Sequence, residues 1–391
     1  MKEIYLDYAA TSAIRPPEVA DAVAGYLQGV GATPGRSGHR RAVEAGRVAL
    51  RCRMALAELF GIGGDPGRVC FQPGATSALN TALFGLLSPG DRVVRTSYDH
   101  NSVRRPLARL RAGGVKEVVL SGSSDGAIDL DELAAALEGG RAPARLLVLP
   151  HASNLLGHVL PVAEMAERAR ARGTLVLLDA AQSAGHLPVR VDQLGVDLLA
   201  FTGHKGLLGP QGTGGLWVRE GVEVTPLLLG GSGGDSALET MPAALPDRLE
   251  AGTQNGPGVA GLLAGVRWLL EQGVERLHAR ELALKERLRE GLVRTPGVRV
   301  LSPPAPDGVG IVTVLLDRLR AEEAALRLER EHGVCVRAGL HCAPEQHRLL
   351  GTLQTGAVRF SLGWASNEDE VNGAVAAVAA VAGVGLEAGT K

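Results

Sequence analysis

Residues 174–205 read TLVLLDAAQSAGHLPVRVDQLGVDLLAFTGHK and contain two apolar runs, 174–179 and 197–202, that each lead into polar residues. Short continuous apolar runs of this kind are typical of strands buried on both faces of a sheet. Helix-like segments such as 129–137 and 162–172 alternate with similar runs on either side, at 68–71, 91–96, 116–121, 145–150 and 214–218. This alternation predicts βαβ units, and therefore an α/β fold with a mostly parallel central sheet covered by helices.

The rest of the chain predicts a second, smaller domain. The stretch 230–246 is rich in Gly and Pro and interrupts the alternation. A helical pattern from about 257 to 293 follows, long enough to bridge two domains, and then come strand-like runs at 310–315, 333–337 and 357–362 and a final helix from Glu368. We expect an N-terminal segment (1–14) packed on the small domain, a large domain (15–246), and a linking helix with a small α+β domain (247–391).

Composition excludes several classes of protein. The 391 residues include 41 Lys and Arg and 42 Asp and Glu, which gives a net charge of -1. A general nucleic-acid-binding protein would have an excess of basic residues, so this class is excluded. The first residues lack the apolar segment of a signal peptide, and no run approaches the roughly 18 apolar residues of a membrane span, so we expect a soluble, cytoplasmic chain. The cysteines form no CxxC pair, and the spacing of Cys335, His341, Cys342 and His347 does not suit a metal, so we expect reduced thiols and no metal site.

Three consecutive strand-like runs lead into polar residues, and in an open α/β sheet ligands bind beyond the carboxyl ends of the strands. The polar residues at these ends are, in chain order, Asn154, Asp179 with Gln182, and Lys205. A lysine in such a crevice favours a Schiff base with pyridoxal phosphate, because that cofactor also needs a carboxylate, here Asp179, for its pyridinium nitrogen. The alternatives are a solvated surface lysine and an aspartate that caps a helix.

The phosphate of this cofactor needs N–H donors, which the start of a helix provides. The run 68–71 leads into Gly74, Ala75 and Thr76, where a helix begins, so backbone amides and the Thr76 hydroxyl would face an anion. Neither GxGxxG nor GxxxxGK[ST] occurs, which leaves dinucleotide and P-loop sites without their fingerprints. An ordinary helix cap is the alternative here.

Three further residues suit chemistry beside such a cofactor. His100 follows a strand-like run and could stack on a flat ring or move protons, although a loop histidine is more often an ordinary hydrogen-bonded residue. Cys342 has Gly, Pro and basic neighbours, and basic neighbours favour the thiolate, the form that attacks sulfur. Arg359 lies in an alternating strand, where its guanidinium could hold a substrate carboxylate or form a structural ion pair. Cys52 and Cys70 lie in apolar stretches and are expected to be inert.

These residues belong to motifs that together resemble the cysteine desulfurases, a group of the class V aminotransferase-like, fold-type I pyridoxal phosphate enzymes. The similarity covers nearly the whole chain: YLDYAAT at 5–11, TGHKGLLGP at 202–210, EAGT at 250–253, RAGLHCAP at 337–344 and VRFS at 358–361. The lysine motif indicates the superfamily, and the cysteine motif together with Arg359 indicates a desulfurase. The 17 positions from Cys342 to Arg359 resemble the members with a compact cysteine loop. Ala75 departs from the pattern, since a hydroxyl residue is common there.

The resemblance implies a function for each site residue. Lys205 would bind pyridoxal 5'-phosphate covalently and act as the base, His100 would stack on the ring, and Cys342 would accept the sulfur. Asp179 would pair with the ring nitrogen and Gln182 with the phenolic oxygen. Asn154 and Arg359 would bind the carboxylate of L-cysteine. The residues implied to hold the phosphate are Ala75, Thr76, Thr202, His204 and, from the neighbouring subunit of a homodimer, Thr253.

The implied reaction converts L-cysteine to L-alanine and leaves a persulfide on Cys342, with His100 as the proton shuttle and a protein as the eventual sulfur acceptor. Iron–sulfur clusters, thiolated cofactors and tRNA all stay open as destinations of the sulfur. The alternatives within this fold are a selenocysteine lyase and an aminotransferase, which would not need Cys342. A non-catalytic regulatory protein that binds pyridoxal phosphate is a remote alternative. Such a protein usually carries a DNA-binding module, and we find no basic helix-turn-helix pattern in the sequence. No nucleic-acid or membrane partner is expected.

Overall fold

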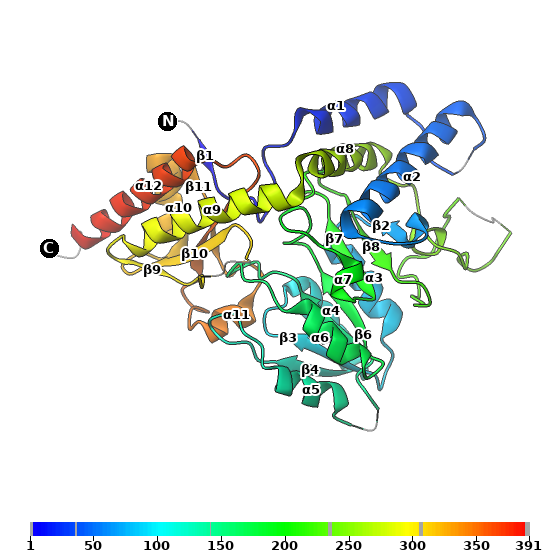
Figure 1. The fold of residues 1–391 in the computed structure, drawn as a ribbon, viewed down its shortest axis with the longest axis horizontal. Helices are drawn as coiled ribbons and strands as arrows, with labels where there is room; N and C mark the ends of the chain where they lie inside the picture. Colours follow the sequence, from blue (N-terminus) through cyan, green and yellow to red (C-terminus); the bar gives the residue numbers. More distant parts are fainter. Residues whose placement is uncertain (1–2, 36, 141, 234–236, 305–307, 388–391) are drawn as a thin grey trace.

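The computed structural model describes residues 3–35, 37–140, 142–233, 237–304 and 308–387 (Figure 1). Its largest feature is a seven-stranded sheet with the strand order β2-β8-β7-β6-β5-β3-β4. The strands are β2 (Val69–Phe71), β3 (Arg92–Thr96), β4 (Lys116–Leu120), β5 (Leu146–Pro150), β6 (Leu175–Asp179), β7 (Leu198–Thr202) and β8 (Gly214–Val218). Strands β3 to β7 pair in parallel, and β8 is antiparallel to both of its neighbours. The predicted α/β fold with a mostly parallel sheet is therefore confirmed.

The central strands are apolar on both sides because helices cover both faces of the sheet. In β5, Leu147 and Leu149 belong to the core on one face, whereas Leu146 and Val148 belong to the core on the other. The helices of the first core are α2 (Arg40–Phe60), α5 (Leu130–Glu138), α6 (Val162–Arg170), α7 (Val191–Leu194) and α8 (Gly256–Gln272), and those of the second are α3 (Ala75–Leu86) and α4 (Asn101–Ala112).

A second, antiparallel sheet of four strands has the order β12-β13-β10-β9. Its strands are β9 (Val298–Val300), β10 (Ile311–Leu316), β12 (Arg337–Gly339) and β13 (Ala357–Ser361), and its helices are α9 (Val274–Val293), α10 (Ala321–His332) and α12 (Glu368–Glu387). Leu288, Val312, Phe360 and Val378 are among the side chains of its core. The first strand, β1 (Ile4–Tyr5), pairs with β11 (Val334–Cys335), and Asp7 then bridges to Ser361, so the start of the chain lies beside this sheet.

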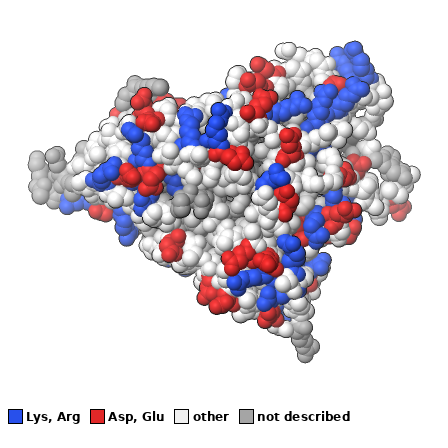
Figure 2. Space-filling model, viewed as in Figure 1, with Lys and Arg blue, Asp and Glu red and all other residues white. Residues whose placement is uncertain are grey.

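The remaining elements are short. They are α1 (Pro17–Gly25), the π-helical turn η1 (Tyr26–Val30), the 3₁₀ turns η2 (Pro66–Arg68) and η3 (Asp247–Leu249), and α11 (Pro344–Leu349). Across the described ranges, we find no helix with the length and apolar character needed to cross a membrane. On the face shown in Figure 2, acidic and basic side chains are interspersed rather than gathered by sign, as expected for a chain with nearly equal numbers of both.

Two of the predicted elements are wrong in detail. The single helix predicted over 257–293 is two helices, α8 and α9, which separate at Gly273. Gly273 has a φ of 78°, a left-handed conformation that glycine adopts at little cost, whereas the apolar pattern continues on both sides of it. The strand predicted over 333–337 is split as well, because β11 pairs with β1 whereas β12 pairs with β13.

Candidate active site

A cavity of about 740 Å³ lies at the carboxyl ends of the parallel strands β5, β6 and β7. The strands end side by side, with Pro150 opposite Asp179 and Asp179 opposite Ala200, so the loops that follow them meet at one edge of the sheet. The predicted site residues that line this cavity are Ala75, Thr76, His100, Asn154, Asp179, Gln182, Thr202, His204 and Lys205. The structure thus brings together residues from five separate segments of the chain.

Lys205 lies in the loop that follows β7, residues 202–209, which we call the lysine loop. Backbone hydrogen bonds hold it: the Gly203 amide donates to the Thr213 carbonyl at 2.8 Å, and the Leu208 amide donates to the Lys205 carbonyl at 2.9 Å. Gly206 packs directly against the loop after β6, since a Cβ at this position would lie 2.4 Å from the carbonyl oxygen of Ala184. Any larger residue at position 206 would therefore force the two loops apart.

The start of the chain also holds the lysine loop. The Ser12 amide donates to the His204 carbonyl at 2.9 Å, and the Ser12 hydroxyl donates to the Lys205 carbonyl at 3.0 Å. The Thr11 hydroxyl donates to the His204 carbonyl at 3.1 Å and lies at the same distance from Nδ1 of that histidine. These contacts could not be predicted from the sequence, because they join residues 193 positions apart and no local sequence pattern indicates them.

The Lys205 side chain is half-buried, and its surroundings favour the neutral amine. Burial lowers the pKa of Lys205 to about 8; the Asp179 carboxylate opposes this shift, and the Arg359 guanidinium adds to it. An amine with this pKa is partly neutral at physiological pH, which is the state in which it attacks an aldehyde or takes a proton.

Asp179 ends β6 and is buried at the floor of the cavity. One of its oxygens accepts from the Ala181 amide at 2.9 Å. Burial raises the pKa of Asp179, while that hydrogen bond and the Lys205 cation oppose the shift. A buried carboxylate of this kind is stabilised by a cationic N–H donor within the cavity. Gln182, three residues further on, donates from its side chain to the Ala9 carbonyl at 3.1 Å.

His100 caps the start of α4 and lines the cavity. Its Nδ1 accepts from the Ser102 amide at 3.0 Å, so in the neutral ring the hydrogen-bond pattern assigns the proton to Nε2. Burial, followed by the nearby Lys205 cation, lowers the pKa of His100 to about 4. The ring is therefore neutral at physiological pH, with a flat face for stacking and one N–H donor.

The start of α3 forms another wall of the cavity. Ala75 and Thr76 begin this helix, and the amides of a first helical turn have no acceptor within the helix. Thr202 lies against this end, because a Cβ on Gly74 would be 3.2 Å from its Oγ1. Such an arrangement binds anions. Thr253 is not part of this wall: it lines a neighbouring cavity of about 200 Å³, which shares Pro73, Gly212 and Leu228 with the larger one.

Arg359 is fully buried in β13, directly behind the cavity wall. Its Nη1 donates to the Asn154 carbonyl at 3.0 Å, and its Nη2 donates to the Asp7 carboxylate at 2.8 Å. Its Nε has no hydrogen-bond partner among the described residues. The ion pair that the sequence left open as an alternative is thus present, and its acidic partner Asp7 was not predicted.

Cys342 lies between β12 and α11 in residues 340–343, which we call the cysteine loop. The Asn101 amide donates to its carbonyl at 2.9 Å, and Nδ2 of Asn154 donates to the His341 carbonyl at 2.6 Å. His341 and Cys342 have φ values of 51° and 57°, in the left-handed region that costs a non-glycine residue roughly 1–2 kcal/mol. Arg337 Nη2 lies 3.9 Å from the thiol sulfur. The cysteine loop thus comes from the small sheet and contacts the cavity wall through Asn154, but Cys342 itself is not among the residues that line the cavity.

The other cysteines have different surroundings. Cys52 and Cys70 are fully buried, and burial raises the pKa of Cys52 to about 12 and that of Cys70 still higher. Cys335 is half-buried in β11. Among the residues that the structure describes, no three or more His, Cys, Asp or Glu side chains come together in a group that could hold a metal ion.

The chain belongs to the class V aminotransferase family, which matches residues 4–373. A probable cysteine desulfurase of Methanothermobacter thermautotrophicus is 32% identical over 98% of this chain and 95% of its own length. A probable cysteine desulfurase 2 of Mycobacterium leprae is 35% identical over 96% of this chain and 90% of its own length. Within the class V family, the chain is thus a member of the cysteine desulfurase group.

Solved structures agree with this assignment. The apo structure of a cysteine desulfurase from Thermococcus onnurineus NA1 matches with a TM-score of 0.91 and 32% identity, over 98% of this chain and 95% of that one. A cysteine desulfurase from Escherichia coli matches with a TM-score of 0.87 and 27% identity over the same shares. The fold is therefore that of the fold-type I pyridoxal phosphate enzymes, as the sequence motifs implied.

Proposed function

We propose that the chain is a pyridoxal phosphate-dependent cysteine desulfurase, which converts L-cysteine to L-alanine and receives the sulfur on Cys342. The observation that carries the proposal is the position of the cysteine loop. Asn154 lines the same cavity as Lys205 and donates to the carbonyl of His341, the residue before Cys342. An aminotransferase of this fold would have no use for a thiol at this point.

The residues of the cavity fit pyridoxal phosphate. When bound, this cofactor supplies an aldehyde that condenses with amines and a conjugated ring that accepts an electron pair from the α-carbon of an amino acid. Lys205 would hold it covalently, with His100 over the ring and Asp179 at the ring nitrogen. Gln182 would contact the phenolic oxygen. The groups proposed for the phosphate are the amides of Ala75 and Thr76, the side chains of Thr202 and His204, and Thr253 of a second subunit.

The substrate carboxylate would be bound by Asn154 and Arg359. Arg359 is held in advance by the Asn154 carbonyl and the Asp7 carboxylate, and its Nε is buried without a hydrogen-bond partner among the described residues. Such preorganisation lowers the entropy that binding must lose. Lys205, as a neutral amine, would then take the proton from the substrate α-carbon.

Sulfur transfer would be the work of Cys342. Its thiolate attacks the sulfur of the substrate, so that an S–S bond forms while the C–S bond breaks and its electron pair stays with the carbon. Protonation of that carbon, with His100 as the proposed proton shuttle, and return of the α-proton by Lys205 then complete L-alanine and leave a persulfide on Cys342. The Arg337 guanidinium lies 3.9 Å from the sulfur. A thiol of a reductant or an acceptor protein then removes the outer sulfur.

A homodimer is part of the proposal. Leu227 and Leu228 are among the residues that line the cavity, and Leu228 and Leu229 are 66% and 77% exposed. Three consecutive exposed leucines beside a site support burial against a second copy, which would also bring Thr253 of that copy toward the phosphate. Analytical ultracentrifugation should show a particle of twice the 40.6 kDa chain mass.

Replacing Cys342 with Ser tests the function, with Cys335→Ser, at a half-buried cysteine in β11, as the control. The wild-type protein, given L-cysteine and a thiol reductant, should release alanine and sulfide in equal amounts. In Cys342→Ser, the absorbance of bound pyridoxal phosphate should persist while sulfide release falls roughly 10²-fold or more, because the nucleophile is gone. Cys335→Ser should stay close to wild type. Unimpaired turnover by Cys342→Ser would overturn the proposal, and alanine formation that depends on a keto acid would indicate an aminotransferase.

A further inference from the structure

The short helix α11, directly after the cysteine loop, is attached to the large sheet by side chains rather than by packing alone. Gln346 donates to the Tyr98 carbonyl at 2.8 Å and accepts from the Ser153 hydroxyl at 2.7 Å. Both of these partners lie on segments that contribute to the cavity, since His100 follows Tyr98 and Asn154 follows Ser153. The position of α11 is therefore tied to the position of the cavity wall.

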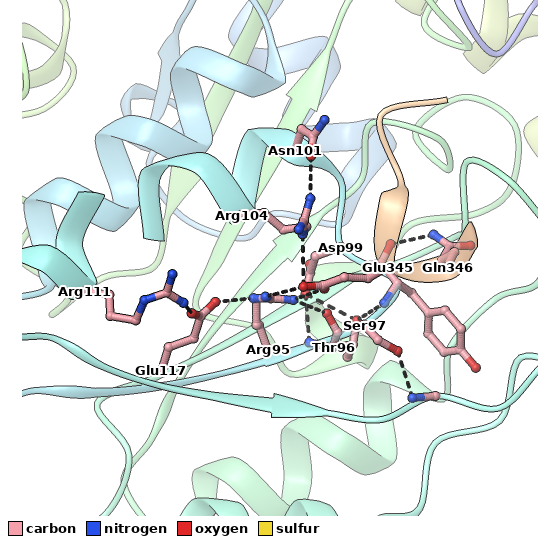
Figure 3. Close-up of polar contacts among 12 residues, drawn as sticks. Arg95, Thr96, Ser97, Asp99, Asn101, Arg104, Arg111, Glu117, Glu345 and Gln346 are labelled. Atoms are coloured by element: carbon pink, nitrogen blue, oxygen red, sulfur yellow. Dashed lines mark hydrogen bonds and ion pairs between the residues drawn. The ribbon is translucent and has the colours of Figure 1, made fainter. Parts of the chain in front are cut away.

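Glu345 makes the strongest of these attachments (Figure 3). Its carboxylate forms a bidentate ion pair with Arg95, at 2.6 and 3.0 Å, across 250 positions of sequence. The Arg95 side chain is only 4% exposed and that of Glu345 17%, so the pair is largely removed from water. Arg95 also contacts Glu117 at 2.5 Å, and Glu117 in turn contacts Arg111. Buried, bidentate pairs of this kind fix geometry, and loss of one partner leaves an uncompensated charge.

A second branch leads from Glu345 back to the cysteine itself. Arg104 Nε lies 3.2 Å from Glu345, and Nη1 of the same arginine donates to Oδ1 of Asn101 at 2.7 Å. The backbone amide of Asn101 donates to the carbonyl of Cys342 at 2.9 Å. The contacts thus form a closed ring, from Cys342 through Asn101 and Arg104 to Glu345 and along three residues of chain back to Cys342.

This ring includes Cys342, which lies in the most strained stretch of described backbone in the site. His341 and Cys342 are consecutive non-glycine residues with positive φ, and such a conformation persists only where its surroundings hold it. In a relaxed loop, Cys342 would adopt a negative φ, and its thiol would point elsewhere. At the other end of this ring lies Glu345, its one acidic residue.

We propose that Glu345 is a positioning residue for sulfur transfer: through Arg104 and Arg95 it holds Cys342 in its left-handed conformation at the cavity wall. Glu345 does not touch the reacting atoms. It acts on the step that needs the thiol and leaves earlier steps, which depend on Lys205, unaffected. The inference rests on the proposed function, because it assigns Glu345 to the sulfur-transfer step of that reaction.

The test compares Glu345→Gln with Glu117→Gln. Both substitutions remove one carboxylate charge from Arg95, but Glu117 lies on the side of Arg95 away from the cysteine loop. Two rates are measured on the loaded protein: persulfide formation on Cys342 in a single turnover, and exchange of the α-proton of cysteine or alanine in D₂O. A thermal melt of each variant, with and without cofactor, records stability separately.

In Glu345→Gln, persulfide formation should fall roughly 10–100-fold, the effect of displacing a reacting group by about an ångström, while α-proton exchange stays within about threefold of wild type. Glu117→Gln should leave the ratio of the two rates unchanged even if it melts earlier. Equal ratios in the two variants, or parallel loss of both rates in Glu345→Gln, would overturn the inference.

Two further arms keep the outcome interpretable. If Glu345→Gln does not fold, Arg104→Gln replaces it, because this change removes the branch to Asn101 while the Arg95–Glu345 pair remains. In Arg104→Gln the ratio of persulfide formation to α-proton exchange should also fall. An unchanged ratio would overturn the inference. Glu345→Asp keeps the charge and should restore part of the ratio. A wild-type protein that forms no persulfide at all would instead refute the proposed function.

Discussion

The lysine loop and the cysteine loop each carry one nucleophile of the proposed reaction, and different forces hold them. The lysine loop is held at its own backbone groups: its amides and carbonyls bond to one another, to Thr213 and to the amide and hydroxyl of Ser12, and Gly206 lies so close to Ala184 that no side chain fits between them. The cysteine loop accepts one backbone bond from the Asn101 amide, but it depends in addition on side chains, namely the Arg95–Glu345 ion pair and the amide of Asn154. The first arrangement is sensitive to volume, whereas the second is sensitive to charge.

The difference has a physical reason. Lys205 follows a strand of the parallel sheet, so its place is determined by strand pairing and by tight packing between neighbouring loops. Cys342 follows a strand of the other sheet, and its loop contacts the wall of the same cavity. Its backbone has a positive φ, a conformation that is unfavourable for a residue other than glycine. Directional contacts to charged groups are the means by which a protein holds such a geometry.

The largest expected effect comes from removing the lysine amine. Lys205→Ala should lose alanine and sulfide production by roughly 10³-fold or more, since loss of a general base alone costs roughly 10²–10⁴-fold. Lys116→Ala, at an exposed position in β4, is the matched control and should behave as wild type. The assay is simultaneous measurement of alanine and sulfide. Substantial residual turnover in Lys205→Ala would mean that the lysine loop does not carry the base.

A smaller effect is expected from pH. Burial lowers the pKa of Lys205 to about 8, so the fraction of neutral amine rises through about pH 8 and levels off above about pH 9. The initial rate at which the apoprotein binds added pyridoxal phosphate covalently should therefore be about tenfold higher at pH 9 than at pH 7. Stopped-flow absorbance measures this rate. A rate that continued to increase above pH 10 would mean that the pKa of Lys205 is not lowered. The buried environment described for the lysine loop would then be wrong.

The smallest expected effect is on stability. A Cβ in Gly206→Ala would lie 2.4 Å from the Ala184 carbonyl oxygen and 2.6 Å from Cδ2 of His186, so the free energy of unfolding should fall by roughly 1–3 kcal/mol. Gly46→Ala in α2 is the control, because a Cβ there meets nothing within 4 Å and a helical alanine is favoured by roughly 0.5–1 kcal/mol. Chemical denaturation measures both. An unchanged midpoint for Gly206→Ala would contradict the packing account of the lysine loop.

Much of the large sheet could be predicted because its strands are buried on both faces and read as unbroken apolar runs. The run predicted at 214–218 is β8 (Gly214–Val218), and that at 174–179 is β6 (Leu175–Asp179), one residue shorter. The break at Gly273 was missed because the apolar pattern continues on both sides of it, although a glycine is itself a common signal for the end of a helix.

The candidate site divides in the same way. Asn154, Asp179 and Lys205 follow strands whose carboxyl ends must meet, so topology alone brings them to one cavity. The contacts of Asp7 with Arg359 and of Glu345 with Arg95 join residues 352 and 250 positions apart, and no rule of spacing connects them.

By itself, the amino-acid sequence determined the order of strands and helices, the polar residues at the strand ends and the motifs of the cysteine desulfurases, because burial and local chemistry leave their pattern in neighbouring residues. Only the tertiary structure decided how the cysteine loop meets the cavity wall, since that depends on hydrogen bonds and ion pairs between distant segments. Those contacts exist only after both sheets have formed, and their energies depend on distance and burial, which the order of residues does not record.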